Sequence, residues 1–448
     1  MTAYPLTFGQ LSVWRIMQRH PVRRWPESYL RDSVPVPGGV RVDQVIEGIG
    51  VLRARHESLR THFFDAPGVP LQRVAPAARP VDVEVVHHDR ADEEAVAAVG
   101  ARLASTRIDR EVEFGDRFAV VTAAGGPAHV VVVVDHIVAD GYGLKRICAE
   151  LSALLGGEDP DGARWLDEEP PRPGELALEQ RSDASRARRE AAVEHWRQLL
   201  RTLPAEVFPV PWSAGESPGR IESVLHSPRA RSDLSAVSAW TAVSPQNVLL
   251  ALSALATAAV TGSERLVMTL QAGNRFSPRW RSIVSSMNQY SPLPVEVGPP
   301  EAAFADFAAR VQTAALNAYR KGSYDVDVIT ELVRRERGVD LGYDHFYNFM
   351  AHGVTASAAA PAARFAPGRV RDTEPYRQIG PRFDIKVRDG ADLPIVVRVD
   401  PLLLPREALH GLLGWFDEEL HRLAGRADTT VGEVLARCAG ALGRRVAG

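Results

Sequence analysis

The fold of the first half of the chain is decided by one stretch, Val130-Val131-Val132-Val133-Val134-Asp135-His136-Ile137-Val138-Ala139-Asp140-Gly141. Five consecutive β-branched residues are unfavourable in a helix, and an apolar run without polar alternation is typical of a strand buried on both faces. After the valines the chain has to turn, because two glycines precede the return of helical spacing at Leu144. The sequence therefore predicts a central strand that ends at a histidine.

His136 is the candidate for chemistry in this stretch. A histidine at the end of a buried strand is held by the backbone and can still face a cleft. Its neutral imidazole titrates near pH 7 and can accept a proton from an attacking amine or hydroxyl. Asp140 can fold back to orient the loop or pair with a cation, and Gly141 is expected to adopt a backbone conformation closed to other residues. Taken alone, the pattern also fits a structural histidine.

Outward from this strand, helical and extended patterns alternate along the whole chain. Apolar spacing predicts helices at residues 11–20, 42–56, 144–155, 175–200, 245–261, 304–319 and 406–423. It predicts further strands at residues 59–64, 81–86, 118–123, 266–270, 383–387 and 395–399. Residues 156–174 are rich in Gly, Pro, Asp and Glu and are expected to be a linker, and residues 351–366 an exposed loop. The expectation is an α/β (α+β) protein with two lobes of similar size, residues 1–174 and 175–448.

Composition limits the classes of function. A chain of 448 residues exceeds a typical single core, and a net charge of -3 gives no electrostatic case for nucleic acid or an anionic membrane as a partner. Cys148 and Cys438 form no CxxC pair, so neither a disulfide framework nor a zinc knuckle is expected. No signal peptide is evident at the start, and residues 248–260 are too short to span a bilayer. We expect a cytoplasmic protein.

Other histidines and the tryptophans are expected to be structural. His56 and His62 are assigned to packing and hydrogen bonding, because one general base is sufficient. His87 and His88, next to Asp89, are expected in a surface turn, since no further residue stands at metal-ligand spacing. Three tryptophans on apolar helical faces are expected in the core: Trp14, Trp240 and Trp415. Gly141-Tyr142-Gly143 lacks the spacing of a phosphate-binding or dinucleotide-binding loop. We expect no metal and no bound cofactor.

The stretch from Asp135 to Gly141 resembles the HHxxxDG signature of the nonribosomal peptide synthetase condensation domains and the chloramphenicol acetyltransferase superfamily. Other blocks resemble the same family in the same order, over essentially the whole chain. They are Tyr4-Pro5-Leu6-Thr7 through Gln10 and Trp14, Arg55-His56-Glu57-Ser58-Leu59-Arg60-Thr61-His62-Phe63, Glu194-His195-Trp196-Arg197-Gln198-Leu199-Leu200, Gly273-Asn274-Arg275, Asn288 to Pro294, Phe346-Tyr347-Asn348-Phe349 and Phe383-Asp384-Ile385. The block Arg55 to Phe63, similar to RHExLRTxF, is the most specific.

The resemblance implies two acetyltransferase-like lobes in a V-shaped pseudo-dimer with a central tunnel. Thioester substrates would reach it on the phosphopantetheine arms of carrier proteins. His136 matches the functional histidine, which takes or positions the proton of the nucleophile. Asp140 matches the structural aspartate, for which Arg275 is the candidate partner. Gly141 matches the glycine whose amide lies near the reacting carbonyl, and Asn288 belongs to a supporting block.

The sequence departs from the family pattern at Asp135, which stands where the first histidine of the signature is expected. An additional acid beside the base could shift its proton affinity. The leading hypothesis is a free-standing acyltransferase that joins a carrier-bound acyl or aminoacyl donor to an amine or alcohol, with amide or ester formation, in natural-product (antibiotic) biosynthesis. Two alternatives stay open. One is a catalytically inactive scaffold that recruits a tailoring enzyme, which the substitution at Asp135 favours. The other is an acyltransferase that uses coenzyme A thioesters.

Overall fold

The computed structural model describes residues 2–77, 81–157, 160–202, 219–339, 344–351, 353–357, 366–375, 377–425 and 428–443. Its contacts divide the chain into two compact units. Unit 1 holds the residues up to Val193 together with Gly273–Gln289 and Ser323–Ile329, and unit 2 holds the remainder. The division differs from the expected boundary after residue 174, because two segments from the second half of the chain pack within unit 1.

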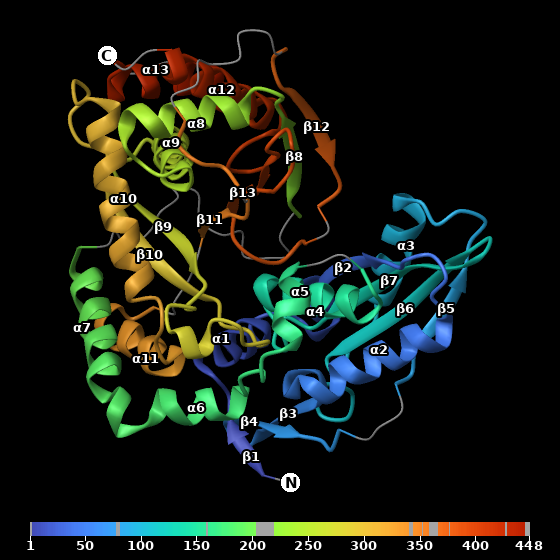
Figure 1. Cartoon of the computed structure of the whole chain (residues 1–448). Coiled ribbons are helices and arrows are strands. Elements are labelled where there is room, and N and C mark those ends of the chain that lie inside the picture. Colours follow the sequence, from blue (N-terminus) through green and yellow to red (C-terminus); the bar gives the residue numbers. More distant parts are fainter. Residues whose placement is uncertain are drawn as a thin grey trace. The chain divides into compact units, whose positions relative to one another are not determined.

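Unit 1 contains two sheets (Figure 1). The four-stranded sheet has the order β2-β7-β6-β5 and consists of Leu30–Pro35, Gly126–Val134, Asp116–Ala123 and Glu84–His87. The three-stranded sheet has the order β1-β4-β3 and consists of Ala3–Pro5, Val69–Val74 and Thr61–Ala66. The helices of unit 1 are α1 (Phe8–Gln18), α2 (Val42–Arg55), α3 (Glu93–Leu103), α4 (Gly141–Leu154), α5 (Pro160–Leu166) and α6 (Pro173–Arg181).

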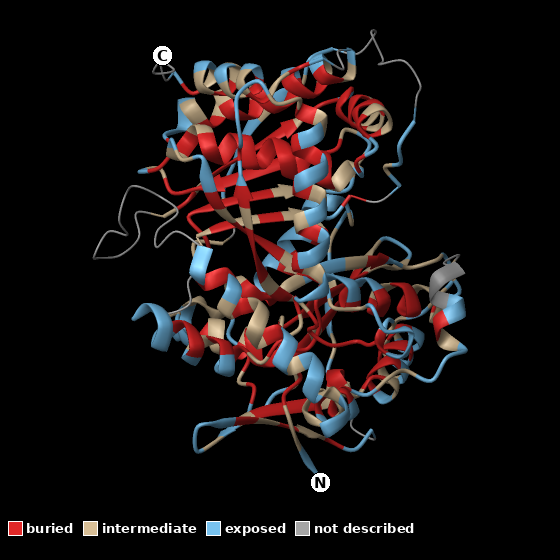
Figure 2. Ribbon diagram, turned by 90° about the vertical axis from the view of Figure 1, so that its left-hand side faces the viewer, coloured by how far each residue is buried: buried red, intermediate tan, exposed pale blue. Residues whose placement is uncertain are grey.

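The valine run is the centre of unit 1. It forms the end of β7, which pairs antiparallel with both β2 and β6. Val131 and Val133 face α3 and belong to its hydrophobic cluster, while the alternate valines point to the opposite face, and all five are buried. The predicted strand with two buried faces is confirmed, since β-branched side chains fill both sides of a central strand efficiently. Figure 2 shows buried residues in red in the interior of the folded chain and exposed residues in pale blue on outer helices and loops.

Unit 2 is built on one mixed sheet of seven strands in the order β10-β9-β11-β13-β14-β8-β12. The strands are Gln289–Glu296, Arg265–Ala272, His345–Phe349, Phe383–Val387, Ile395–Val399, Ile221–His226 and Arg369–Thr373. The helices that lie wholly in unit 2 are α8 (Ala230–Thr241), α9 (Pro245–Thr261), α10 (Phe304–Arg320), α12 (Arg406–Gly425) and α13 (Val431–Ala441). Two helices continue from unit 1 into unit 2, α7 (Arg186–Thr202) and α11 (Val326–Arg337). The apolar face of the sheet packs on a large core that includes α9, α10 and α12.

Many of the predicted elements are confirmed, several of them to the residue. The helix predicted at residues 245–261 is α9, and the strands predicted at 383–387 and 395–399 are β13 and β14. Among the described residues no single helix is long and apolar enough to cross a membrane. Only α8 and α9 taken together, with a bend of 95° between them, reach the required length and composition.

Several features of the secondary structure differ from the expectations or were not predicted. The expected linker at 156–174 contains α5 and the start of α6, and Trp165 within it is buried. The single helix expected at 175–200 is two helices, α6 and α7, broken at Ser182, whose hydroxyl bonds the carbonyl of Glu179 at 2.8 Å. Residues 57–60 form a 3₁₀ turn before β3. The helix at 406–423 is followed by α13, which the capping-box pattern Thr430-x-x-Glu433 indicates in the sequence.

Part of the expected loop at 351–366 lies outside the described residues, namely residue 352 and residues 358–365. The expected tryptophan core positions are confirmed for Trp14 and Trp415, which are buried. Trp240 is half-buried and donates its indole N–H to the carbonyl of Leu423 at 2.9 Å.

The buried histidine of β11 makes the stability of unit 2 depend on pH. His345 Nε2 lies 3.0 Å from Thr257 Oγ1, which donates its own proton to the carbonyl of Ser253, so the imidazole donates from Nε2. Nδ1 has no partner among the described residues. Burial lowers the pKa of His345 to about 4. The neutral form is therefore kept in the folded protein, whereas the unfolded chain binds a proton below pH ~6.5.

We predict that unit 2 loses about 3 kcal/mol of stability as the pH falls from 6.5 to 4, because the unfolded state then binds one more proton at His345 than the folded state. His345→Phe should flatten this dependence in urea unfolding measured from pH 7 to 4.5. His87→Ala, a change at an exposed histidine of unit 1, should leave the pH dependence of the stability of unit 2 unchanged. An unchanged pH dependence in His345→Phe would contradict the prediction.

Candidate functional site

The candidate site lies where β7 ends and α4 begins, within unit 1. His136 follows the last valine of β7 and is half-buried, in contrast to its neighbours Asp135 and Ile137, which have no exposed surface. The end of the strand and the following turn therefore position His136, which keeps part of its surface exposed.

Asp140 is the residue that joins the loop to a distant part of the chain. It caps the N-terminus of α4, with Oδ1 accepting the amide of Gly143 at 2.9 Å. Oδ1 also accepts from Arg275 Nη2 at 2.5 Å, and Oδ2 accepts the amide of Met287 at 3.0 Å. The structure shows the expected pairing with Arg275. Because the carboxylate is buried, these three donors together offset the cost of removing its charge from water.

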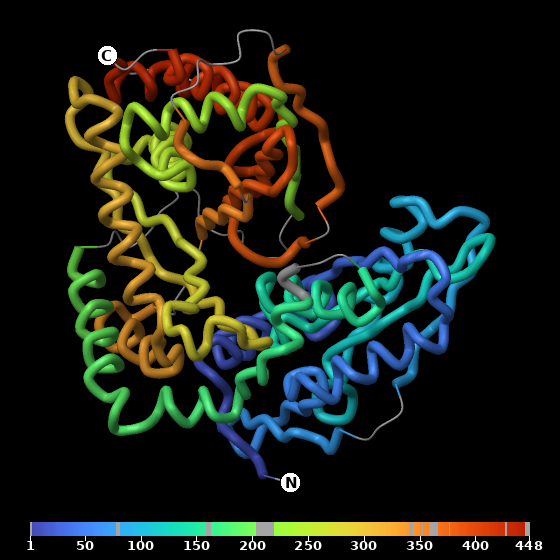
Figure 3. Tube along the Cα trace, in the orientation of Figure 1, coloured from blue at the N-terminus to red at the C-terminus, as the bar shows by residue number. Residues whose placement is uncertain are grey.

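Helix α1 supports the same segment from the other side. A capping box begins α1, in which Thr7 Oγ1 accepts the amide of Gln10 at 3.2 Å and Gln10 Oε1 accepts the amide of Thr7 at 2.9 Å. A Cβ on Gly9 would lie 2.2 Å from the carbonyl oxygen of Ser286, so only glycine allows this approach. Figure 3 shows the yellow segment Gly273–Gln289 beside the blue α1.

Ser286 is brought next to His136 by this packing, although 150 positions separate them in sequence. Its Oγ lies 3.4 Å from His136 Nδ1, a long contact. When Nδ1 carries the ring proton, it points to this oxygen and Nε2 keeps a lone pair that can accept a proton. Ser286 was not among the predicted site residues, because no feature of the sequence pairs it with His136.

Gly141 corrects one expectation. Its φ is not in the positive region, and a Cβ built on it would meet no atom within 4 Å. The glycine is therefore not required by the backbone. It is exposed at the first position of α4, where amide groups have no partner inside the helix, and a side chain there would meet open space.

Asp135 points into the interior of unit 1, where its carboxylate pairs with Arg110. Arg110 Nε donates to Oδ2 at 2.7 Å and Nη2 to Oδ1 at 2.8 Å, and both side chains are buried. The acid at this position is therefore neutralised by a guanidinium within the interior. Arg110 was missed in the sequence, because it lies in a turn 25 residues earlier with no pattern that links it to Asp135.

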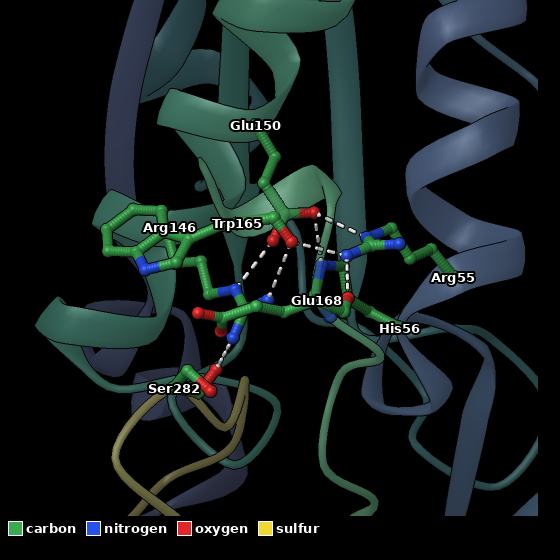
Figure 4. A network of polar contacts seen from close by, with 7 residues as sticks. All are labelled: Arg55, His56, Arg146, Glu150, Trp165, Glu168 and Ser282. Carbon is green, nitrogen blue, oxygen red and sulfur yellow. Dashed lines mark hydrogen bonds and ion pairs between the residues drawn. The ribbon is translucent and has the colours of Figure 1, made fainter. Parts of the chain in front are cut away.

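A second buried network ties α4 to the same distant segment (Figure 4). Glu150 accepts Arg146 Nε at 2.6 Å and Arg55 Nε at 3.0 Å, and it lies 2.8 Å from His56 Nε2. Arg146 also donates to the carbonyl of Ser282. The expectation that His56 is a packed, hydrogen-bonded residue is confirmed. His62 is buried as well, with its ring against that of Phe114 at 4.9 Å.

The pKa shifts in this network favour an ionised glutamate beside a neutral histidine. Burial lowers the pKa of His56 and outweighs the attraction of Glu150. Burial by itself would raise the pKa of Glu150, but the hydrogen bonds from His56 and Arg146 and the charge of Arg146 lower it overall. Neutral His56 therefore donates from Nε2 to the carboxylate, and the charge of Glu150 is balanced by its arginines.

Of the predicted site residues, the structure brings together His136, Asp140, Gly141 and Arg275. Asn288 is half-buried, and it is the preceding residue, Met287, whose amide bonds Asp140. Within the described residues no group of three or more His, Cys, Asp or Glu side chains could hold a metal ion. His87 ends β5, with Nδ1 3.2 Å from Thr122 Oγ1.

The stacked aromatic ring of Tyr142 borders the site. Arg275 lies over the ring at 4.7 Å from its centroid, and the indole of Trp165 lies 6.2 Å away. Tyr142 is exposed by 39%, and Phe276, which follows Arg275, by 62%. Aromatic side chains therefore lie next to the exposed amide end of α4.

Comparison with known proteins identifies relatives of this arrangement. A family model described as "Condensation domain" matches residues 1–356. Cyclosporin synthetase simA from Tolypocladium inflatum is 26% identical over 332 residues, which are 70% of this chain and 2% of that protein. The chain thus spans a few per cent of the length of the curated relatives it matches first.

Solved structures share the fold. The first condensation domain of the calcium-dependent antibiotic synthetase, in complex with substrate analogue 2a, superposes with a TM-score of 0.72 at 19% identity, over 97% of this chain and 99% of that chain. The SgcC5 protein from Streptomyces globisporus superposes with a TM-score of 0.69 at 19% identity, over 95% of this chain and 100% of that chain. The chain thus has the mixed α/β fold of condensation domains, related to chloramphenicol acetyltransferase.

We predict that Asp140→Asn lowers the free energy of unfolding of unit 1 by about 3 kcal/mol, because the guanidinium of Arg275 then lies beside a neutral amide. Urea unfolding measures the change. Asp92→Asn is the matched control, since Asp92 caps α3 through Ala95 and is exposed, and asparagine caps as well as aspartate. Equal stabilities of the two variants would show that the ion pair contributes nothing.

We predict opposite effects for two glycine substitutions. Gly141→Ala should leave the stability unchanged or raise it by up to about 1 kcal/mol, because the added methyl meets no atom and alanine favours a helix. Gly9→Ala should lower it by about 1–3 kcal/mol, because its methyl overlaps the backbone at Ser286. Thermal unfolding compares them, and a destabilised Gly141→Ala would contradict the assignment of open space there.

Proposed function

Because the chain belongs to the condensation-domain family, we propose that it is an acyltransferase of nonribosomal peptide or related natural-product biosynthesis. It transfers an acyl or aminoacyl group from a carrier-protein thioester to an amine or alcohol and forms an amide or ester. The observation that carries this proposal is the placement of His136, half-buried in the turn after β7, with Nδ1 3.4 Å from Ser286 Oγ.

The proposed step moves one proton and exchanges one bond. The nitrogen or oxygen of the acceptor attacks the thioester carbon, and the bond between that carbon and sulfur breaks. His136 takes or positions the proton of the nucleophile, and this proton ends on the leaving thiol. A positioned base contributes about 10²–10⁴-fold to such a reaction. The thioester is already activated, so the step requires no nucleotide.

The N-terminus of α4 supports the developing negative charge in this proposal. The amide of Gly141 lies at the first turn of the helix, where the N–H groups and the helix dipole favour an anion. The open space over Gly141 admits the reacting carbonyl. Asp140 and Arg275 are assigned a supporting role, because their charges are bound to each other and to Met287 and fix the turn that carries His136.

The proposed partners are an acyl- or peptidyl-carrier protein that presents the donor on its phosphopantetheine arm, and a small amine or alcohol acceptor. We propose that the reaction takes place in the cytoplasm and that the chain holds no cofactor of its own. Two observations support these partners: cyclosporin synthetase and other peptide synthetases are relatives, and the related domain of the calcium-dependent antibiotic synthetase was solved with a substrate analogue.

We predict that His136→Ala lowers the rate of acyl transfer from a loaded carrier protein by about 10²–10⁴-fold while the fold is kept. Intact-protein mass spectrometry of the carrier, with a panel of amines and alcohols, measures the loss of the acyl group. His87→Ala, at an exposed histidine of unit 1, should transfer as fast as the unchanged protein. Equal rates for His136→Ala and the unchanged protein would exclude the assigned role of the histidine.

The same assay separates the alternatives. If the acyl group is transferred from an acyl-coenzyme A thioester but from no loaded carrier protein, the donor is coenzyme A and not a carrier protein. Absence of transfer from any thioester, with stable binding to a tailoring enzyme, would indicate a recruitment scaffold instead. The Asp135 carboxylate is bound by Arg110, and this pairing by itself favours neither an active enzyme nor a scaffold.

A further inference from the structure

Asp135 organises the turn that presents His136. Its Oδ1 accepts the amide of Ile137 at 3.1 Å, which closes an Asx turn around the histidine. Its backbone carbonyl accepts the amide of Val138 at 2.9 Å, and its own amide donates to Gly115 at 2.7 Å. A single residue therefore fixes the backbone on both sides of His136.

The carboxylate that closes this turn is held by a guanidinium that is itself fixed. Arg110 binds both oxygens of Asp135, and its guanidinium lies over the indole of Trp25 at 4.8 Å and near that of Trp14 at 5.9 Å. Its backbone carbonyl accepts the amide of Phe63 at 2.8 Å. A bidentate, stacked arginine restricts the position of a carboxylate more tightly than a single donor does.

Burial makes the two charges depend on each other. The side chains are exposed by only 3% for Arg110 and 1% for Asp135. An unpaired charge at this depth is far more costly than a paired one. Tyr29, the neighbouring ionisable group, is kept neutral, because burial and the charge of Asp135 raise the pKa of its phenol to about 12. The two side chains therefore hold each other in place inside unit 1.

From these contacts we propose that Asp135 and Arg110 are positioning residues that hold the orientation of the His136 ring. Asp135 stands where the family signature has its first histidine. Together with Arg110 it takes over the supporting role of that histidine. The predicted effect on kcat rests on the proposed function. The predicted effect on the orientation of the His136 ring does not depend on it.

The experiment compares three variants, Asp135→Ala, Asp135→Asn and Arg110→Met, with the pair Asp135→Asn plus Arg110→Met. Asparagine can still close the Asx turn but carries no charge. Misplacement of a catalytic group by ~1 Å costs about 10²-fold, so we expect a loss of kcat of about 10²-fold in Asp135→Ala with KM within about twofold. In Asp135→Asn and in Arg110→Met we expect kcat to fall by about 10-fold. In the double variant, which leaves no unpaired charge, we expect kcat to recover in part.

A second readout does not depend on activity. The imidazole nitrogen resonances of His136, assigned by comparison with His136→Gln, report the tautomer and titration of the ring in each variant. We expect them to shift in Asp135→Asn and Arg110→Met. Asp417→Asn is the matched control, because Asp417 forms a similarly buried pair with Arg229 in unit 2 and should leave the His136 resonances unchanged.

The outcomes are distinguishable. Unchanged His136 resonances together with an unchanged kcat in Asp135→Asn would overturn the inference. This test does not require Asp135→Ala to fold. Shifted resonances with unchanged turnover would overturn the assignment of these residues to catalysis. Shifted resonances in a protein that transfers no acyl group, even without substitutions, would refute the proposed function and support the positioning of the ring.

Discussion

The carboxylate of Asp140 is the point on which the candidate site depends. It is buried, it begins α4, and it binds Arg275 and the amide of Met287 from a segment more than 130 residues further along the chain. A buried carboxylate without such donors would be costly, and the guanidinium of Arg275 would have no counter-charge here. The same interaction therefore sets the direction of the helix, the position of the returning segment and the surroundings of His136.

Around this interaction, unit 1 uses charge pairs to fix backbone turns. Arg110 and Asp135 hold the turn before α4, while Arg146 connects Glu150 on α4 with the carbonyl of Ser282. Each pair is buried, so it contributes little to net stability compared with an apolar substitute, but it defines one geometry. A site that must position one imidazole benefits from such geometry more than from additional stability.

Both units contain buried pairs of an aspartate and an arginine that connect separate elements. In unit 2 the buried Asp417 binds Arg229, Ser227 and the amide of Gly368, and so connects α12 to the start of α8 and to the edge strand. In unit 1 the corresponding pairs fix the turn before α4 and the distant segment at Ser282, and His136 lies in that turn. The family signature falls on the same turn, so the candidate site is assigned to unit 1.

The sequence by itself determined the elements that local physics controls. The valine run predicted a central strand with two buried faces, the apolar spacing of residues 245–261 predicted a core helix, and the signature from Asp135 to Gly141 indicated the candidate histidine. The pairing of Asp140 with Arg275 was also predicted, although only through the family resemblance. These features depend on residues close in sequence or on a recognised pattern.

Only the tertiary structure decided which distant residues complete the site. Ser286 beside His136, Arg110 on Asp135 and Gly9 under the returning segment carry no local signal, because such contacts depend on how separate elements pack. The structure also showed that Gly141 is left open rather than required by its backbone, and that residues 273–289 fold within unit 1. Side-chain charges find their partners in space, and a sequence records spacing along the chain but not these distances.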